Sequence, residues 1–175
     1  MEYYLLKSNS VRNPEPARLS HEEFPYLMNE ENFMIAQDKF VDYYMLFPET
    51  ELPELLTQPT FLCRDGLKRI LELYDPYIEW KSLYLLPSED EQMTTGTLHY
   101  WLPAMTKQNC LHDECVILPN GAVQELILDK RKIRNMDVFQ VGGTQENIVV
   151  VSLALAESIS RRHLYGVKLC KVEVR

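Results

Sequence analysis

The sequence predicts a single domain of the α+β class, a mainly antiparallel sheet with a few short helices packed on it. Three observations lead to this class: a strand–helix–strand pattern near the C-terminus, a strong hairpin signal at residues 119–121, and short apolar runs that dominate the second half. The 175 residues suit one domain, and the hydrophobic fraction of 46% suits a packed core. We therefore expect one domain over residues 1–175, with an acidic N-terminal third (1–58) and a sheet-rich remainder (59–175).

The C-terminal pattern begins with a strand and a helix. The run Ile148–Val151 has no polar interruption, which predicts a strand buried on both faces. Ser152 follows, and its hydroxyl can cap the helix that we expect over Ser152–His163. The apolar residues of this helix recur at helical spacing; they are Leu155, Ala156 and Ile159.

The same pattern ends in a turn and a second strand. The basic residues 161–163 fall in the expected last turn, where cations complement the partial negative charge of a helix C-terminus. Gly166 permits the turn that follows. The strand that opens at Val167 changes the phase of its alternation at Cys170, so we expect a bulge or a two-faced strand end there.

Residues 61–86 repeat this pattern more faintly. A short strand at 61–63 precedes a helix expected over Asp65–Tyr74, which Asp65 is placed to cap and which Pro76 helps to end. A second strand is expected at Leu83–Leu86. The helical positions of the two units align as Leu67 with Leu155 and Leu71 with Ile159. Internal duplication and chance similarity both remain open as explanations.

Before residue 61 the pattern is less regular. Tyr3–Leu6 predicts a first strand. Residues 30–47 fit either one helical face or, over Phe40–Phe47, a strand. Thr50 is placed to cap a short helix over Leu52–Leu56.

Turn residues divide the second half into strands. The residues Pro119-Asn120-Gly121 predict a tight hairpin turn, because Asn-Gly readily adopts positive φ angles. A looser turn at Gly142-Gly143 is expected to join Val138–Val141 to Ile148–Val151. Leu98–Leu102 predicts a strand stopped by Pro103, and residues 88–96 predict a loop.

One cysteine-rich segment invites a chemical interpretation. Cys110, His112 and Cys115 could begin a tetrahedral zinc site or supply a Cys–His nucleophilic pair. However, the spacing Cys-x-His-x-x-Cys is not a common zinc-binding pattern, and no second ligand pair stands nearby. We therefore expect no metal, no cofactor and no catalytic residue. Cys63 and Cys170 lie in apolar strands and are interpreted as small core residues.

Two further clusters are interpreted as structural. The basic run Lys130-Arg131-Lys132 with Arg134, beside Asp129, is typical of a solvated strand edge that resists pairing with another chain. The glycines at 142 and 143 are not followed by the Lys-Ser or Lys-Thr that a phosphate-binding loop requires.

Several motifs of the C-terminal third together resemble one family. They are Leu128-Asp129 before Lys132-Ile133, a strand centred on Phe139, Val151-Ser152 at a helix start, and Gly166-Val167-Lys168-Leu169 near the end. In this combination the chain resembles the immunity-eleven group, proposed antidote proteins of bacterial polymorphic-toxin systems. Leu169 stands where the family more often has Phe, and Tyr3–Leu6 is also similar.

The resemblance implies a binding protein that neutralises a partner toxin by occlusion. The group supplies no catalytic residues that could be transferred to this chain. Two alternatives remain: an enzyme or regulatory module of unknown chemistry that uses the Cys110–Cys115 region, and a structural assembly partner.

Charge indicates what kind of partner to expect. Residues 1–58 hold eleven acidic and four basic residues, a net charge of −7 out of −8 for the chain. Such a surface repels nucleic acid and suits a basic protein toxin, although a charge excess can also serve solubility alone. The candidate partner-binding residues are Glu22, Glu23, Glu30, Glu31, Asp38, Asp42, Glu49, Glu51 and Glu54.

The sequence also predicts a location in the cell. No apolar run approaches the roughly 18 residues that a membrane-spanning helix needs. The N-terminus has neither a basic start nor an apolar segment of signal-peptide length. We therefore expect a cytoplasmic protein with no membrane partner and with reduced cysteines. The oligomeric state is not predicted.

Overall fold

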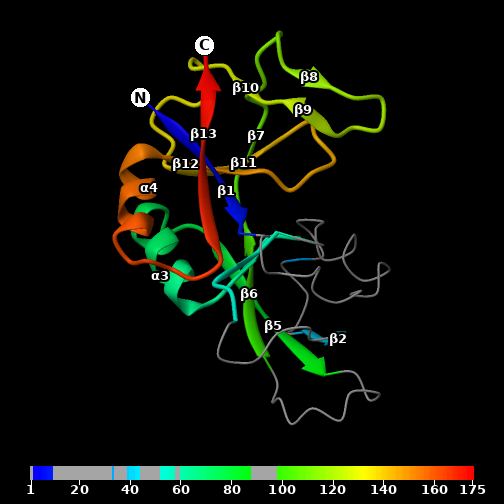
Figure 1. The fold of residues 1–175 in the computed structure, drawn as a ribbon, viewed down its shortest axis with the longest axis vertical. Helices are drawn as coiled ribbons and strands as arrows, with labels where there is room; N and C mark the ends of the chain where they lie inside the picture. The colour runs from blue at the N-terminus through cyan, green and yellow to red at the C-terminus, as the bar shows by residue number, and fades with distance from the viewer. Residues whose placement is uncertain (1, 10–32, 34–38, 44–51, 58–59, 88–97) are drawn as a thin grey trace.

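The computed structural model describes residues 2–9, 33, 39–43, 52–57, 60–87 and 98–175, and the findings below concern these residues (Figure 1). The α+β class is confirmed, because antiparallel and mixed sheets carry the helices α3 (Asp65–Tyr74) and α4 (Leu153–Ser160). Within the described ranges no helix is both long and apolar enough to cross a membrane.

The larger sheet has six strands in the order β10-β13-β1-β12-β11-β7. Its members are β1 (Tyr3–Ser8), β7 (Lys107–Gln108), β10 (Ile127–Leu128), β11 (Val138–Val141), β12 (Val149–Ser152) and β13 (Val167–Val174). β1 lies between β12 and β13 and is antiparallel to both. The predicted N-terminal strand therefore completes a sheet whose other strands all come from residues 107–174.

The second sheet has five strands in the order β2-β5-β6-β4-β3. Its members are β2 (Lys39–Tyr43), β3 (Leu55–Leu56), β4 (Leu62–Cys63), β5 (Glu79–Pro87) and β6 (Leu98–Ala104). β2 pairs parallel to β5, and the other pairs are antiparallel. A separate two-stranded hairpin consists of β8 (Val116–Ile117) and β9 (Val123–Glu125).

Both predicted strand–helix–strand units are present, and they share one topology. In the first unit, β4 and β5 lie on either side of β6 and are antiparallel to it. In the second unit, β12 and β13 lie on either side of β1 in the same way. Each helix thus connects two parallel strands that are separated by one antiparallel strand. The separating strand follows the first unit directly but comes from the far end of the chain in the second.

The two helices lie side by side and share one apolar core (Figure 1). The buried positions are Leu67, Ile70 and Leu71 of α3 with Leu155, Ala156 and Ile159 of α4. They include the two pairs that the sequence patterns aligned, Leu67 with Leu155 and Leu71 with Ile159. A second core covers the opposite face of the larger sheet around Tyr3, Phe139 and Val150. Alternation along β1 sends Leu6 to the helix side and Tyr3 to the second core.

The start of the second unit agrees with the sequence prediction. All four residues of β12 are buried, and the Ser152 hydroxyl accepts a hydrogen bond from the Leu155 N–H at 3.4 Å. The prediction for the helix end is wrong. α4 stops at Ser160, so the basic residues 161–163 lie beyond its last turn. His163 has a φ of 48°, a left-handed conformation with which an α-helix cannot continue.

The turn and strand that follow are partly as predicted. Gly166 adopts a φ of 77°, as its role in a tight turn requires. Of the two alternatives predicted at Cys170, the bulge is absent, because β13 pairs with β1 in one register from Val167 to Val172. The strand is instead two-faced. Val167 and Leu169 pack against the helix-side core, whereas Val172 and Val174 lie on the side of the second core.

The first unit also follows its prediction, except at the helix start. Helix α3 spans Asp65–Tyr74 as expected and ends before Pro76. Asp65, however, does not cap the helix: it is the first helical residue, and its carboxylate accepts a hydrogen bond from Trp101 Nε1 at 2.6 Å.

Two local predictions are overturned by sheet pairing. Pro103 does not stop its strand, since β6 continues to Ala104. β4 meets β6 only at Trp101, so Pro103 is flanked by β5 alone, a position that tolerates the missing N–H. The short helix predicted over Leu52–Leu56 is absent. Leu55 and Leu56 form β3, and both side chains are buried against the sheet.

The hairpin predictions are confirmed. β8 and β9 pair across the Pro119-Asn120-Gly121 turn, where Gly121 has a φ of 78°. β11 and β12 pair across the looser turn, where Gly143 has a φ of 80°. The strand alternative holds over Lys39–Tyr43. Thr50, the loop at 88–96 and most of residues 30–47 lie outside the described residues.

Candidate functional site

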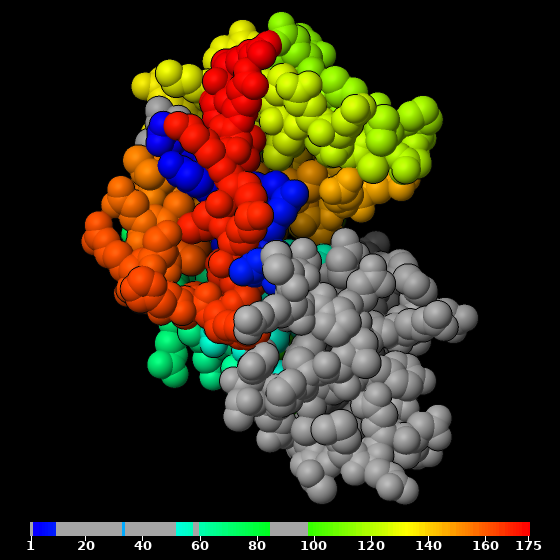
Figure 2. Space-filling view, viewed as in Figure 1, coloured from blue at the N-terminus to red at the C-terminus, as the bar shows by residue number. Residues whose placement is uncertain are grey.

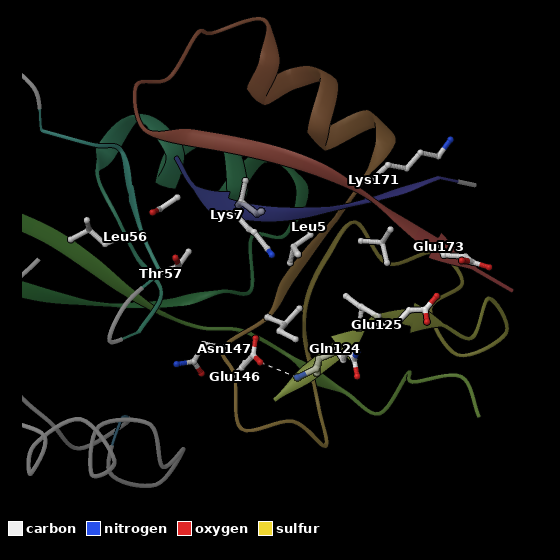
Figure 3. Close-up of a pocket in the computed structure, with 16 residues that line it drawn as sticks. Leu5, Lys7, Leu56, Thr57, Gln124, Glu125, Glu146, Asn147, Lys171 and Glu173 are labelled. Carbon is white, nitrogen blue, oxygen red and sulfur yellow. Dashed lines mark hydrogen bonds between the residues drawn. The ribbon is translucent and has the colours of Figure 1, made fainter. Parts of the chain in front are cut away.

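A cleft of about 700 Å³ opens beside β1 and β13 (Figure 3). Its walls come from five separate segments: residues 5–8, 56–57, 123–126, 146–148 and 171–173. Because these segments are far apart in the sequence, no local motif indicates the cleft.

The cleft combines apolar walls with a cation. Leu5, Ile148 and Val172 line it and also belong to the second core or pack against it. Leu5 and Lys7 point into the cleft from β1, whereas Lys171 points away from it (Figure 3). Lys171 instead pairs with Glu2. The cation that the cleft itself presents is therefore Lys7.

The wall opposite β1 is held by specific hydrogen bonds. Glu146 Oε1 accepts a hydrogen bond from the Val123 N–H at 2.9 Å, which ties the loop before β12 to β9 (Figure 3). The Asn147 amide donates to Thr60 Oγ1 at 3.2 Å and accepts from Gln140 Nε2 at 2.9 Å. These bonds fix the shape of the cleft without using Lys7.

The β8–β9 hairpin projects next to the cleft (Figure 1). Residues 113–125, which comprise this hairpin and the residues that lead into it, are called the hairpin arm below. Three consecutive apolar side chains of the arm are exposed: Val116 by 41%, Ile117 by 42% and Leu118 by 39%. Asp113, Glu114 and Glu125 are also exposed, and residues 109–129 contain no Lys or Arg. The arm thus presents an apolar and acidic surface.

The base of the arm is fastened by the buried carboxylate of Asp129. This carboxylate accepts hydrogen bonds from the Arg131 N–H, Nε and Nη2 at 2.9, 3.1 and 2.8 Å. Lys132 Nζ lies 3.7 Å from it and donates to the Leu111 carbonyl at 3.1 Å. The hydrogen bonds and charge from Arg131 hold the pKa of Asp129 well below its usual range.

This arrangement refines the interpretation of the basic run at 130–134. Arg131 and Lys132 neutralise Asp129 and connect it to the chain that enters the arm. Lys130 and Arg134 are exposed in the turns that follow β10, so they are solvated but do not lie on a strand edge as predicted. The run is therefore partly structural support for the arm and partly a solvated turn.

The cysteine-rich segment lies at the same base. Cys110 is fully buried, and this burial raises the pKa of its thiol to about 11, so the thiol stays protonated at neutral pH. Cys115 Sγ donates to the Glu125 carbonyl at 3.1 Å, and His112 Nδ1 accepts from the Glu114 N–H at 3.3 Å. Among the described residues no group of three or more His, Cys, Asp or Glu side chains could hold a metal. Of the other cysteines, Cys63 is fully buried and Cys170 only half-buried.

Of the predicted acidic site, the structure describes the side chain of Glu54. Its Oε2 accepts a hydrogen bond from the Leu67 N–H at 3.1 Å, so it occupies the start of α3. Its side chain is 19% exposed and lies 4.0 Å from the Arg64 guanidinium. Asp42 lies in β2. The remaining candidates lie outside the described residues: Glu22, Glu23, Glu30, Glu31, Asp38, Glu49 and Glu51.

The exposed part of the arm and Lys7 were not among the site residues predicted from the sequence. A signal for the first was present: Val116, Ile117 and Leu118 directly precede a tight turn, where consecutive apolar residues have little sheet to cover them. For Lys7 no local signal existed, since its surroundings arise from tertiary contacts. The chain matches no protein-family model, and no curated protein sequence matches it.

Proposed function

We propose that this protein binds another protein and neutralises it, and that the partner is a bacterial toxin. Two kinds of support lead here. The motifs between Leu128 and Leu169 resemble the immunity-eleven group, whose proposed role is toxin neutralisation. The hairpin arm supplies a surface suited to protein recognition, and it is the observation that carries the binding proposal.

The exposed apolar patch of the arm is energetically unfavourable in water. Three neighbouring apolar side chains in water, at the end of a two-stranded hairpin, add little to the core of their own domain. Exposed apolar patches with a polar rim are typical of protein interaction sites. Burial of these side chains against a partner would recover the hydrophobic free energy that folding leaves unused.

Charge favours a basic partner. The arm carries exposed Asp113 and Glu125 and no basic residue, and residues 1–58 carry a net charge of −7. Opposite charge on a toxin would speed encounter with both regions. The proposed mechanism is occlusion, in which the bound protein covers the active surface of the toxin.

The direct test is recovery of the partner from the native cell. The tagged chain is used for affinity purification, and co-purifying proteins are identified by mass spectrometry. We expect one basic protein encoded beside this gene, whose expression alone harms cells and whose co-expression with this chain does not. A neighbouring protein that neither binds nor harms cells would contradict the proposal.

The acidic contribution is tested by reversing four charges together. We expect the variant Glu22→Lys, Glu23→Lys, Glu30→Lys, Glu31→Lys to associate with the toxin more slowly and to protect cells less. The melting curves of parent and variant serve as the control for folding, because substitutions of surface charges generally alter stability by only about 0.5 kcal/mol each. The defect should shrink as salt rises, since screening acts beyond about 10 Å at 0.1 M. Parent-like binding and protection at low salt would rule out the acidic mechanism.

A further inference from the structure

We propose that the outer edge of β13 is a second binding site, which accepts an extended acidic segment of a partner protein as an added strand. This inference goes beyond the proposed neutralising function and uses neither the exposed apolar residues of the hairpin arm (Val116, Ile117 and Leu118) nor the acidic residues of 1–58. It rests on an open backbone edge, on two lysines that face each other beside it, and on the adjoining cleft.

Over most of its length, the outer backbone edge of β13 is paired with no strand among the described residues. β10 pairs with β13 only through Ile127 with Glu173 and Leu128 with Val174. Residues 167–172 therefore have β1 on one side and no described strand on the other. In Figure 2, β13 (red) runs uncovered along the face of the molecule that is shown.

The backbone hydrogen bonds show which residues of β13 direct their N–H and C=O groups away from β1. The Asn9 N–H donates to the Gly166 carbonyl at 2.9 Å, so the even-numbered residues of β13 face β1. The N–H of Arg175 donates to the Leu128 carbonyl, so the odd-numbered residues face outward. Among the described residues, no backbone partner is found for the outward N–H and C=O groups of Val167, Leu169 and Lys171. An added strand would bond to these groups.

Two lysines mark the charge that the added strand must carry. Lys7 and Lys168 are direct cross-strand partners, so their side chains extend from the same face of the sheet. Both are exposed, and within the described part of the chain neither makes an ion pair. Like charges directly opposite each other are unfavourable in an antiparallel pair. A carboxylate placed beside β13 at this level would relieve that repulsion.

The cleft provides space for side chains on the same face. It lies between β13 and the segment 123–126 that precedes β10, and its lining includes Lys7 and Val172. Because residues two apart on a strand share one face, an acidic side chain beside the two lysines can be followed two positions later by an apolar one that enters the cleft. The site therefore favours a segment that carries an acidic and a β-branched residue two positions apart.

The same lysines argue against a second copy of this chain. If two β13 edges paired with each other about their middle, the Lys168 side chains of both copies would approach on the same face of the sheet, where Lys7 adds further positive charge, and the cations would repel. Lysines on an edge strand commonly prevent such self-pairing. They leave the edge available to an acidic segment from another protein.

The first test uses a synthetic eight-residue peptide that repeats Val-Val-Glu-Glu, so that each face of the strand carries both valine and glutamate, titrated into isotopically labelled full-length protein. In the free protein, the amides of Val167, Leu169 and Lys171 should exchange with solvent faster than those of Lys168 and Cys170. The peptide should protect the three outward amides and shift their resonances. The matched valine–lysine peptide should have no effect.

Paired variants locate the interaction. Lys171→Pro removes an outward N–H together with the ion pair to Glu2 and should weaken peptide binding about tenfold. Lys171→Ala also loses the ion pair but keeps that N–H, and it should bind like the parent. Lys7→Glu with Lys168→Glu should abolish binding of the acidic peptide and permit binding of the lysine peptide. Lys107→Glu, an exposed change on β7 at the other edge of the same sheet, should have no effect.

Three outcomes would overturn the inference. The outward amides could already be protected in the free protein, the acidic peptide could fail to bind at millimolar concentration, or Lys171→Pro could bind as well as Lys171→Ala. Loss of toxin protection in a hairpin-arm variant that still binds the peptide would separate this site from the proposed neutralising surface.

Discussion

The two strand–helix–strand units follow the same path but begin their helices in different ways. Helix α4 is capped by the residue directly before it, because the Ser152 hydroxyl accepts from the Leu155 N–H. Helix α3 has no such local cap at Arg64, and the carboxylate of Glu54 reaches the Leu67 N–H from outside the unit. A repeated fold can thus be stabilised by a local residue in one copy and a distant one in the other.

The same distant segment also supports the second unit. The Glu54 N–H donates to the Tyr165 carbonyl at 2.8 Å, and Pro53 lies against Gly166 at the turn before β13. Residues 53 and 54 therefore connect the start of one helix to the turn after the other. One short segment thus contacts both units in addition to their shared core, and the predictions below test how much stability those contacts provide.

The largest effect is expected at Gly166. A Cβ atom there would lie 2.4 Å from the Cβ and 3.0 Å from the Cα of Pro53, and φ is 77°. Gly166→Ala should destabilise the protein by roughly 3 kcal/mol, since backbone strain adds to a clash with main-chain atoms. Chemical denaturation measures this.

Gly143 provides the matched control. Its φ is 80°, but a Cβ would meet only Leu111 Cδ1, at 3.9 Å. Gly143→Ala should cost about 1 kcal/mol, from strain alone. Equal costs at the two glycines would show that the contact with Pro53 does not matter.

The next effect concerns the two helix caps. Ser152 also donates to Asp137 Oδ1 at 2.6 Å and is buried, so Ser152→Ala should cost about 2 kcal/mol. Glu54→Ala removes a partly exposed cap and should cost about 1 kcal/mol. Equilibrium unfolding compares the two. A Glu54→Ala protein as stable as the parent would refute the distant cap.

A smaller and pH-dependent effect is expected at Asp129. Its folded pKa is lowered by Arg131, so the unfolded state binds the proton first as pH falls below about 4. The stabilisation is complete above that pH and is lost as pH falls toward the lowered folded value. Asp129→Asn should flatten this acid-side loss in a series of unfolding curves. An unchanged slope would mean that the ion pair does not form in solution.

The sequence was most informative where structure is determined locally. The buried strand β12, the Ser152 cap, the extent of α3 and both hairpin turns depend on residues close together, so their patterns predicted them. The predictions failed where pairing with a strand distant in the sequence determines the local structure. Leu55 and Leu56 form a strand because β4 is beside them, and Pro103 is tolerated because β4 is short.

The candidate sites were harder to predict for the same reason. The cleft and the Lys7–Lys168 pair exist only once β1 has inserted between β12 and β13. The predicted acidic residue whose side chain is described, Glu54, stabilises a helix, a role that charge counting could not distinguish from partner binding. The three consecutive apolar residues of the hairpin arm were visible in the sequence. Their exposure could not be predicted from it, because exposure depends on which strands cover them in the folded sheet.

The central claim, that the hairpin arm binds the partner protein, is tested most directly by two exposed apolar positions. Ile117 lies on the arm, and Leu73 lies on α3 with 71% of its surface exposed. With the partner recovered from native cells, Ile117→Asp should weaken binding at least about tenfold and reduce protection. Leu73→Asp should bind like the parent, and both variants should melt normally. Parent-like binding by Ile117→Asp, or an equal loss in both variants, would contradict the account.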